Sequence, residues 1–287
     1  MSTQKHLRSI LSLFLKGVGI GAANTVPGVS GGTIAAITGI YDRLIHAIST
    51  FFKAWKKNAL ILGPVGLGAL LGIALFASLV EYLLGAVPQA TAFFFIGLIV
   101  GSLPFLLGQV AGRRLRAPQI IAAVIAAGVV ILMGVAGRPP MTEPITTLSV
   151  TNSLWLLLAG AIAAATMIIP GVSGSFVLLL IGMYQTFITA VSSGNLPLLA
   201  VLGAGALIGI VAVSRVLDLL FARFYAATYW AIIGLVAGSV AGIWPSVTSQ
   251  EPLWLSLVAV AAGFGLAFGL GSRKREVPEE EREEQEV

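Results

Sequence analysis

Ten apolar runs of about 20 residues follow one another along the chain, with short polar connections between them. They lie at residues 7–26, 29–50, 59–81, 88–109, 117–136, 150–169, 172–193, 196–222, 227–245 and 252–271. As a helix, each can cross a hydrocarbon core of roughly 30 Å. With 57% hydrophobic and 10% charged residues, the chain lacks the polar surface that a soluble protein needs. We therefore predict an all-α integral membrane protein in which residues 1–272 form a single polytopic domain.

Side chains suited to metal or thiol chemistry are scarce. The chain has no cysteine, and its two histidines are His6 and His46. Both map to the cytoplasmic edge of the expected topology, and no cluster of histidine and carboxylate residues has the spacing of a metal site. We expect no catalytic residue, no metal and no cofactor.

Basic residues gather in alternate connections. Lysine and arginine occur at the start of the first run and after the second, fourth, eighth and tenth runs, whereas the other connections hold only Arg138. By the positive-inside rule both termini are cytoplasmic, so the net charge of +5 indicates orientation and not a nucleic-acid partner. The Glu-rich tail, 273–287, is predicted to be disordered in the cytoplasm. The first run also has the pattern of a secretory signal peptide, but its equivalence to 150–169 favours retention.

A polar turn of the same sequence occurs twice. The segment Asn24-Thr-Val-Pro-Gly-Val-Ser-Gly-Gly, followed by Ile40-Tyr41, returns as Ile169-Pro-Gly-Val-Ser-Gly-Ser, followed by Met183-Tyr184. The similarity continues through pairs of glycines four residues apart, at 68/72 and 97/101 in the first copy and 205/209 and 234/238 in the second. Such pairs are expected to pack helices closely. Each copy has five segments, an odd number, which predicts two inverted repeats, about 7–136 and 150–271.

The Pro-Gly turn of each repeat is predicted at mid-membrane. Lys16 lies eleven residues before Pro27, and Asp42 lies about fifteen residues after it, so helical rise puts both charges roughly 16 to 22 Å from the turn. A turn at the outer surface would leave these charges inside the hydrocarbon. Each repeat is therefore expected to begin with a re-entrant helical hairpin broken at Pro-Gly-Val-Ser-Gly. Irregular backbone at that depth must be buried in protein or line an aqueous cavity.

The two turns have the chemistry of an anion site. Their prolines end the incoming helices, their glycines permit close backbone approach, and the hydroxyls and helix N-termini favour a phosphate or carboxylate. The alternative is two kinks that only help the helices pack. The substrate-binding residues predicted in the turns are Asn24, Pro27, Gly28, Ser30, Gly31, Gly32, Thr33, Pro170, Gly171, Ser173, Gly174 and Ser175.

Three charged residues lie in the runs 59–81 and 196–222, which are predicted to cross the membrane completely. Glu81 and Asp218 occupy equivalent repeat positions, and Arg215 lies one helical turn before Asp218. Ionisable groups at such places are costly and commonly functional. Arg215 is predicted to bind phosphate, with an ion pair to Asp218 near a helix end as the alternative. Glu81 and Asp218 are assigned to proton coupling or to structure.

The residues from Gly21 to Thr33 and from Pro170 to Ser175, with the later Gly-x-Tyr of each copy, resemble the PopT-type polyprenyl-phosphate transporters. The resemblance extends to about Gly271. It implies a transporter and not an enzyme, which returns undecaprenyl phosphate, the lipid carrier of cell-wall precursors, from the outer to the inner leaflet of the cytoplasmic membrane. The implied partners are this lipid and the bilayer, with no oligomeric state indicated.

The mechanism we expect is alternating access, in which the turns and Arg215 hold the phosphate while the prenyl tail stays in lipid. Two alternatives remain open. A transporter of a small soluble anion would share every physical feature of the sequence. A membrane lipid-phosphate phosphatase is less favoured, because no histidine lies near either serine turn to act as a general base or acid.

Overall fold

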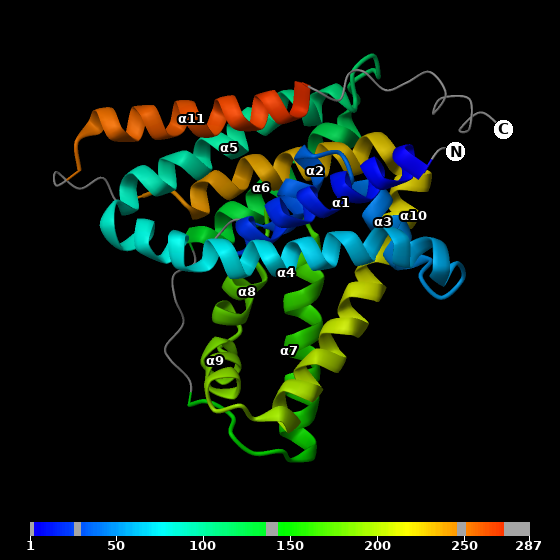
Figure 1. The fold of residues 1–287 in the computed structure, drawn as a ribbon, viewed down its shortest axis with the longest axis vertical. Coiled ribbons are helices and arrows are strands. Elements are labelled where there is room, and N and C mark those ends of the chain that lie inside the picture. Colours follow the sequence, from blue (N-terminus) through cyan, green and yellow to red (C-terminus); the bar gives the residue numbers. More distant parts are fainter. Residues whose placement is uncertain (1–2, 26–29, 136–142, 246–250, 273–287) are drawn as a thin grey trace.

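A computed structural model describes residues 3–25, 30–135, 143–245 and 251–272, and within these ranges the chain forms eleven helices and no strand (Figure 1). The tail predicted at 273–287 lies outside the described residues. The helices are α1 (Thr3–Asn24), α2 (Gly31–Ile37), α3 (Tyr41–Ser49), α4 (Trp55–Ala86), α5 (Pro88–Gly108), α6 (Ala117–Val135), α7 (Val150–Ile168), α8 (Gly174–Leu180), α9 (Tyr184–Ser192), α10 (Leu196–Gly242) and α11 (Leu253–Ser272).

Six of these helices are long and apolar enough to cross a membrane, or up to seven spans if α8 and α9 together count as one. The six are α4, α5, α6, α7, α10 and α11. Large apolar side chains on them face outward, as Leu70, Val124 and Leu257 do with 65–67% of their surface exposed. Apolar surface on this scale is stable against lipid and not against water. The prediction of an all-α, multi-pass membrane protein is therefore confirmed.

Each of the runs predicted at 29–50 and 172–193 is divided into two short helices. The break follows a glycine in the left-handed conformation, Gly39 with φ 61° and Gly182 with φ 73°. The next amide then reaches back five residues, from Ile40 to the carbonyl of Ala35 at 3.0 Å, and the second run repeats this bond. This is the Schellman ending of a helix, which favours glycine because a β-carbon opposes positive φ. The axes of α8 and α9 consequently differ by 114°.

The runs predicted at 196–222 and 227–245 are two helices of α10 that meet at a kink at Phe224, where φ is −132° and ψ is 41°. The corresponding runs of the first half are two separate helices, α4 and α5, joined at Val87. Both halves of the chain therefore have two helices here, joined at Val87 in the first half and at Phe224 in the second.

The paired glycines bring helices into backbone contact, as predicted. Within each half, α1 packs on α4 and α7 packs on α10. A β-carbon added to Gly21 or Gly209 would lie 2.0 Å from a carbonyl oxygen of the facing helix. Other pairs cross between the halves, since α5 packs on α11 through Gly97 and α6 packs on α10 through Gly234. Close approach of this kind stabilises helix pairs in lipid.

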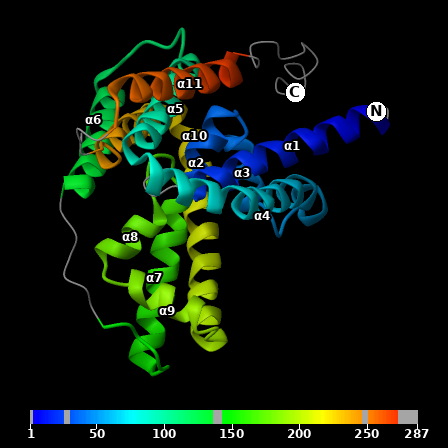
Figure 2. The ribbon, with the colours of Figure 1, turned by 60° about the vertical axis from the view of Figure 1, so that its left-hand side comes forward.

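Helices α7, α8, α9 and the first part of α10 form an arm that extends from the body of the molecule (Figures 1 and 2). The largest hydrophobic core lies in the body and joins α1, α2 and α3 to α5 and α10, with Leu13, Ile45 and Leu106 among its buried members. A smaller core, with Leu156 and Leu198 at its centre, holds the arm together.

Replacing Gly68 by leucine should prevent correct folding. A β-carbon at this position would lie 2.1 Å from the carbonyl oxygen of Phe14, so α1 and α4 would have to separate. Overpacking commonly costs about 1 to 3 kcal/mol, and the upper end is expected where backbone must move. Gly66→Leu is the matched control, because nothing lies within 4 Å of a β-carbon there. Size-exclusion chromatography and thermal unfolding of both variants in detergent test this; equal behaviour would contradict the packing described.

Candidate functional site

The two Pro-Gly turns contact each other directly. The hydroxyl oxygen of Ser30 lies 3.1 Å from the carbonyl oxygen of Met167 and 3.2 Å from that of Ile169, close enough to donate to either. The amide of Gly171 donates to the hydroxyl oxygen of Thr33 at 3.0 Å. These bonds join residues more than 130 positions apart in the sequence. They fix the start of α2 against the end of α7.

Some of the predicted turn residues are buried by protein, and others line a cavity. Gly31, Gly32, Thr33, Pro170 and Gly171 are buried, and none of them lines the cavity described below. A β-carbon on Gly32 would lie 2.3 Å from a backbone carbonyl oxygen of α7, so the close approach requires glycine. Pro27 and Gly28 lie outside the described residues.

The start of α2 is capped by side chains. The amide of Gly31 donates to Oδ1 of Asn24 at 2.9 Å, and the amide of Gly32 donates to the hydroxyl oxygen of Ser30 at 3.1 Å. These amides are therefore already hydrogen-bonded, in contrast to the expectation that both outgoing helices present them to an anion. At the start of α8, Ser173 makes no such capping bond, and its hydroxyl lies 3.0 Å from that of Ser175.

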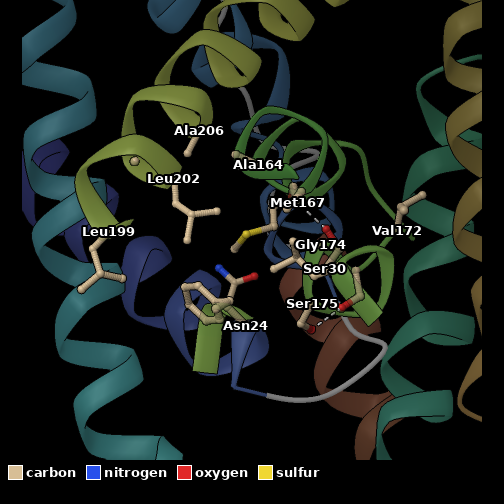
Figure 3. Close-up of a pocket in the computed structure, with 16 residues that line it drawn as sticks. Asn24, Ser30, Ala164, Met167, Val172, Gly174, Ser175, Leu199, Leu202 and Ala206 are labelled. Carbon is tan, nitrogen blue, oxygen red and sulfur yellow. Dashed lines mark hydrogen bonds between the residues drawn. The ribbon is translucent and has the colours of Figure 1, made fainter. Parts of the chain in front are cut away.

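A cavity of about 350 Å³ lies beside the meeting point of the turns. Its polar side chains are those of Asn24, Ser30, Ser173 and Ser175. Its other walls are apolar and are contributed mainly by Gly160, Ala163, Met167, Phe187, Leu199 and Leu202. In Figure 3 the leucines from α10 lie on one side and the serines on the other, with Asn24 and Met167 between them.

Of the charged residues predicted within the apolar runs, none lines this cavity. Arg215 is exposed on α10, nine residues beyond Ala206 of the cavity wall, which is about 14 Å of helical rise. Glu81 is exposed near the end of α4. Within the described part of the chain, neither forms an ion pair, so the alternative in which Arg215 pairs with Asp218 is not the arrangement seen.

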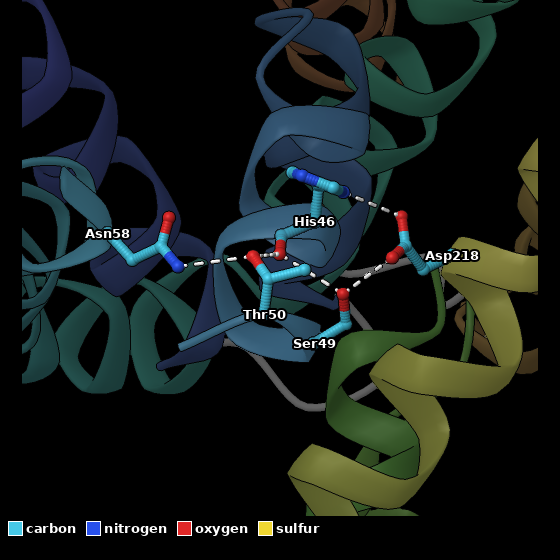
Figure 4. Close-up of polar contacts among 5 residues, drawn as sticks. All are labelled: His46, Ser49, Thr50, Asn58 and Asp218. Atoms are coloured by element: carbon cyan, nitrogen blue, oxygen red, sulfur yellow. Dashed lines mark hydrogen bonds and ion pairs between the residues drawn. The ribbon is translucent and has the colours of Figure 1, made fainter. Parts of the chain in front are cut away.

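Asp218 instead connects α10 to α3. Its carboxylate accepts a hydrogen bond of 2.6 Å from the hydroxyl of Ser49 and lies 3.1 Å from Nδ1 of His46 (Figure 4). Beyond the bend at Phe224, the hydroxyl of Tyr229 donates to the carboxylate of Asp42 at 2.8 Å. Helix α3 is thus bound to α10 on both sides of its bend. We refer to these bonds together as the α3–α10 contact.

The sequence reasoning missed His46, Ser49 and Tyr229. A weak signal was present, because Asp42, His46 and Ser49 recur at helical spacing on one face of α3, within an otherwise apolar run. Nothing in the sequence indicated that this face meets α10. A further bond, from Nδ2 of Asn58 to the hydroxyl oxygen of Thr50 at 3.1 Å, fixes the start of α4 near the end of α3 (Figure 4).

The fold and the site together define a class: multi-pass α-helical membrane proteins in which two turns of related sequence contact each other beside a cavity. This chain belongs to the undecaprenyl phosphate translocase-like family, whose model matches residues 20–257. The resemblance noted from the turn motifs is thereby confirmed.

Two characterised relatives cover nearly the whole chain. The polyprenyl-phosphate transporter of Vibrio cholerae serotype O1 is 39% identical, over 91% of this chain and 96% of the relative. The polyprenyl-phosphate transporter of Staphylococcus aureus is 34% identical, over 90% of this chain and 94% of the relative. No solved structure matches the chain.

Proposed function

We propose that this protein transports polyprenyl phosphate from the outer to the inner leaflet of the cytoplasmic membrane. The relatives that carry this name are 39% and 34% identical to the chain over at least 90% of its length. The observation that carries the proposal is the cavity, which combines hydroxyl and amide groups at the turns with apolar walls. A substrate with a small polar head and a hydrocarbon tail would match both the polar groups and the apolar walls.

The alternative functions fit the cavity less well. A small soluble anion would gain nothing from apolar walls, since such a surface stabilises hydrocarbon and not charge. A phosphatase needs a nucleophile with a general base within hydrogen-bond reach. The described residues that line the cavity include hydroxyls but no histidine, carboxylate or lysine.

The topology that we propose has two inverted repeats with both termini in the cytoplasm. The hairpin of α1, α2 and α3 enters from the cytoplasm, and that of α7, α8 and α9 enters from outside. Corresponding packing supports this, because α1 with α4 matches α7 with α10, and α5 with α11 matches α6 with α10. Most of the residues that line the cavity belong to the second half, so in this topology the cavity would open toward the outer leaflet, where the substrate would be collected.

The mechanism that we propose is alternating access with the α3–α10 contact as the closed inner side. By repeat symmetry, the partners of Ser49 and Asp218 are Ser192 on α9 and Glu81 on α4. Helices α4 and α9 do not pack on each other in this structure, whereas α3 and α10 do. Release to the inner leaflet would separate α3 from α10 and bring α9 to α4. Asp218 would accept a hydrogen bond from Ser49 when the inner side is closed, and Glu81 would accept one from Ser192 when the outer side is closed.

Arg215 would act at a later stage than the turns. No cationic side chain among the described residues lines the cavity, so the phosphate there is held by hydroxyl and amide groups and stays partly hydrated. Separation of α3 from α10 would open a path along α10 toward the guanidinium of Arg215. A guanidinium binds phosphate through two parallel hydrogen bonds, which suits it to draw the head group inward.

Reconstitution tests the proposed function. We expect purified protein in vesicles to move labelled polyprenyl phosphate between leaflets at least about tenfold faster than protein-free vesicles, because a charged head crosses hydrocarbon very slowly unaided. The measurement is the fraction of label accessible to an external phosphatase over time. Accelerated exchange of soluble phosphate without lipid movement would support the soluble-anion alternative, and release of inorganic phosphate by the protein itself would support the enzyme.

A further inference from the structure

The cavity is larger than a phosphate group requires. Its volume is about 350 Å³. A water molecule occupies roughly 30 Å³ of liquid, so the cavity has room for about a dozen non-hydrogen atoms. A phosphate group uses fewer than half of these. The remaining space corresponds to a five-carbon isoprene unit.

The polar groups of the cavity are confined to one end. Asn24, Ser30 and Ser175 lie where the turns meet, and the opposite wall consists of Leu199 and Leu202 on α10 (Figure 3). An occupant with charge throughout would leave the leucine wall without a favourable contact. An occupant that is polar at one end and hydrocarbon at the other satisfies both walls.

The apolar end of the cavity reaches the surface beside α9 and α10. Phe187 and Gly203 line the cavity and are also exposed. Val191 and Leu207, on the same two helices, are 52% and 67% exposed. The opening is therefore surrounded by apolar surface of the kind that faces lipid. A hydrocarbon chain can leave the cavity here without crossing a polar region.

From this arrangement we infer that the cavity binds the phosphate and the first isoprene unit of the substrate together, and that the rest of the chain leaves between α9 and α10 into the bilayer. This rests on the proposed function and revises the expectation that the whole prenyl tail stays in lipid. The apolar wall formed by Leu199, Leu202 and Phe187 then determines specificity, because it distinguishes a prenyl phosphate from inorganic phosphate.

A larger side chain can be placed beside this wall at Gly203 without a clash in the fold. A β-carbon added there meets nothing within 4 Å, although the residue lines the cavity. Leucine at 203 would therefore occupy the space assigned to the isoprene unit, and in a helix it is more favourable than glycine. Gly63 on α4 is the matched control, because its β-carbon also meets nothing within 4 Å and it does not line the cavity.

The test is competition for transport of labelled polyprenyl phosphate by the full-length protein in vesicles. We expect isopentenyl phosphate to inhibit the wild type at least about tenfold more strongly than inorganic phosphate, since it adds five buried carbon atoms. Gly203→Leu should lose this preference and bind polyprenyl phosphate at least about tenfold more weakly, whereas Gly63→Leu should behave as wild type. Ala206→Leu, which also narrows the cavity, serves if the first variant does not fold.

The outcomes separate this inference from the proposed function. A wild-type protein that moves no polyprenyl phosphate would contradict the proposed function. Wild-type transport in which isopentenyl phosphate inhibits no better than inorganic phosphate would overturn the isoprene site alone. So would folded Gly203→Leu and Ala206→Leu proteins that keep the wild-type affinity for the lipid.

Discussion

Oxidation of the double variant Ser49→Cys, Asp218→Cys should stop transport of polyprenyl phosphate completely, and reduction should return it to the rate of the same variant before oxidation. The two native side chains are joined by a hydrogen bond of 2.6 Å, so cysteines there lie within reach of a disulfide or a short thiol-reactive linker. The chain has no other cysteine to interfere. A covalent bond between α3 and α10 would hold the inner side closed, and the substrate could enter the cavity but not leave inward.

The reduced sample of the same double variant is the reference for this experiment, because it carries both substitutions without the bond. The single variants under oxidant control for damage by the reagent. Binding of polyprenyl phosphate to the outer cavity should be unchanged after oxidation. If the cross-linked protein transports as fast as the reduced protein, the α3–α10 contact is not the inner gate.

The symmetry of the proposal can be examined with the corresponding pair, Glu81→Cys and Ser192→Cys. Helices α4 and α9 are not packed together in this structure, so these cysteines should cross-link slowly. Their cross-linking should accelerate at least about tenfold when the α3–α10 contact is weakened by Tyr229→Phe, which removes a bond to a carboxylate. An unchanged rate would contradict the inverted-repeat mechanism.

Removal of the guanidinium of Arg215 should reduce transport more than tenfold, while the protein still inserts and folds. Within the described residues it has no ion-pair partner, so its loss leaves no buried carboxylate unpaired. Arg215→Lys should keep less than about half of the activity, because lysine retains the charge but not the two parallel hydrogen bonds. The measurement is the initial rate of lipid movement in vesicles, normalised to folded protein.

Arg223 provides the control for Arg215. It is also an exposed arginine of α10, one residue before the bend at Phe224. Arg223→Ala should change transport less than twofold, as expected for a residue whose charge only sets the orientation of the chain in the membrane. The double variant Arg215→Ala, Asp218→Ala should not recover, because the partners of Asp218 are Ser49 and His46. Full activity in that double variant would show that Arg215 only neutralises the charge of Asp218 and does not bind the substrate.

The apolar runs located the helices well because length and composition decide membrane crossing. The breaks at Gly39 and Gly182 were not predicted, although the repeated Gly-x-Tyr sequence indicated them. The run preceding each glycine is apolar and helix-compatible, so only the left-handed conformation of the glycine shows that the helix ends there.

The sequence does not predict which helices pack on each other. The glycines at 97 and 234 predict close packing but carry no information about which helix is opposite, and both contact a helix from the other half of the chain. The same holds for Asp218, whose partners on α3 come from 169 and 172 positions away. The position of the cavity could not be predicted from the sequence either. Two similar turn sequences predict two equal sites, whereas most of the residues that line this cavity belong to the second half.

The crossed packing of α5 on α11 and of α6 on α10 means that the halves are interlocked and not merely adjacent. Each half contributes a helix that covers the glycine-lined face of a helix from the other, so neither could bury that face alone. Separation of the two halves would therefore expose backbone-deep, glycine-lined grooves on both, so the two halves are expected to fold as one cooperative unit and not as independent domains.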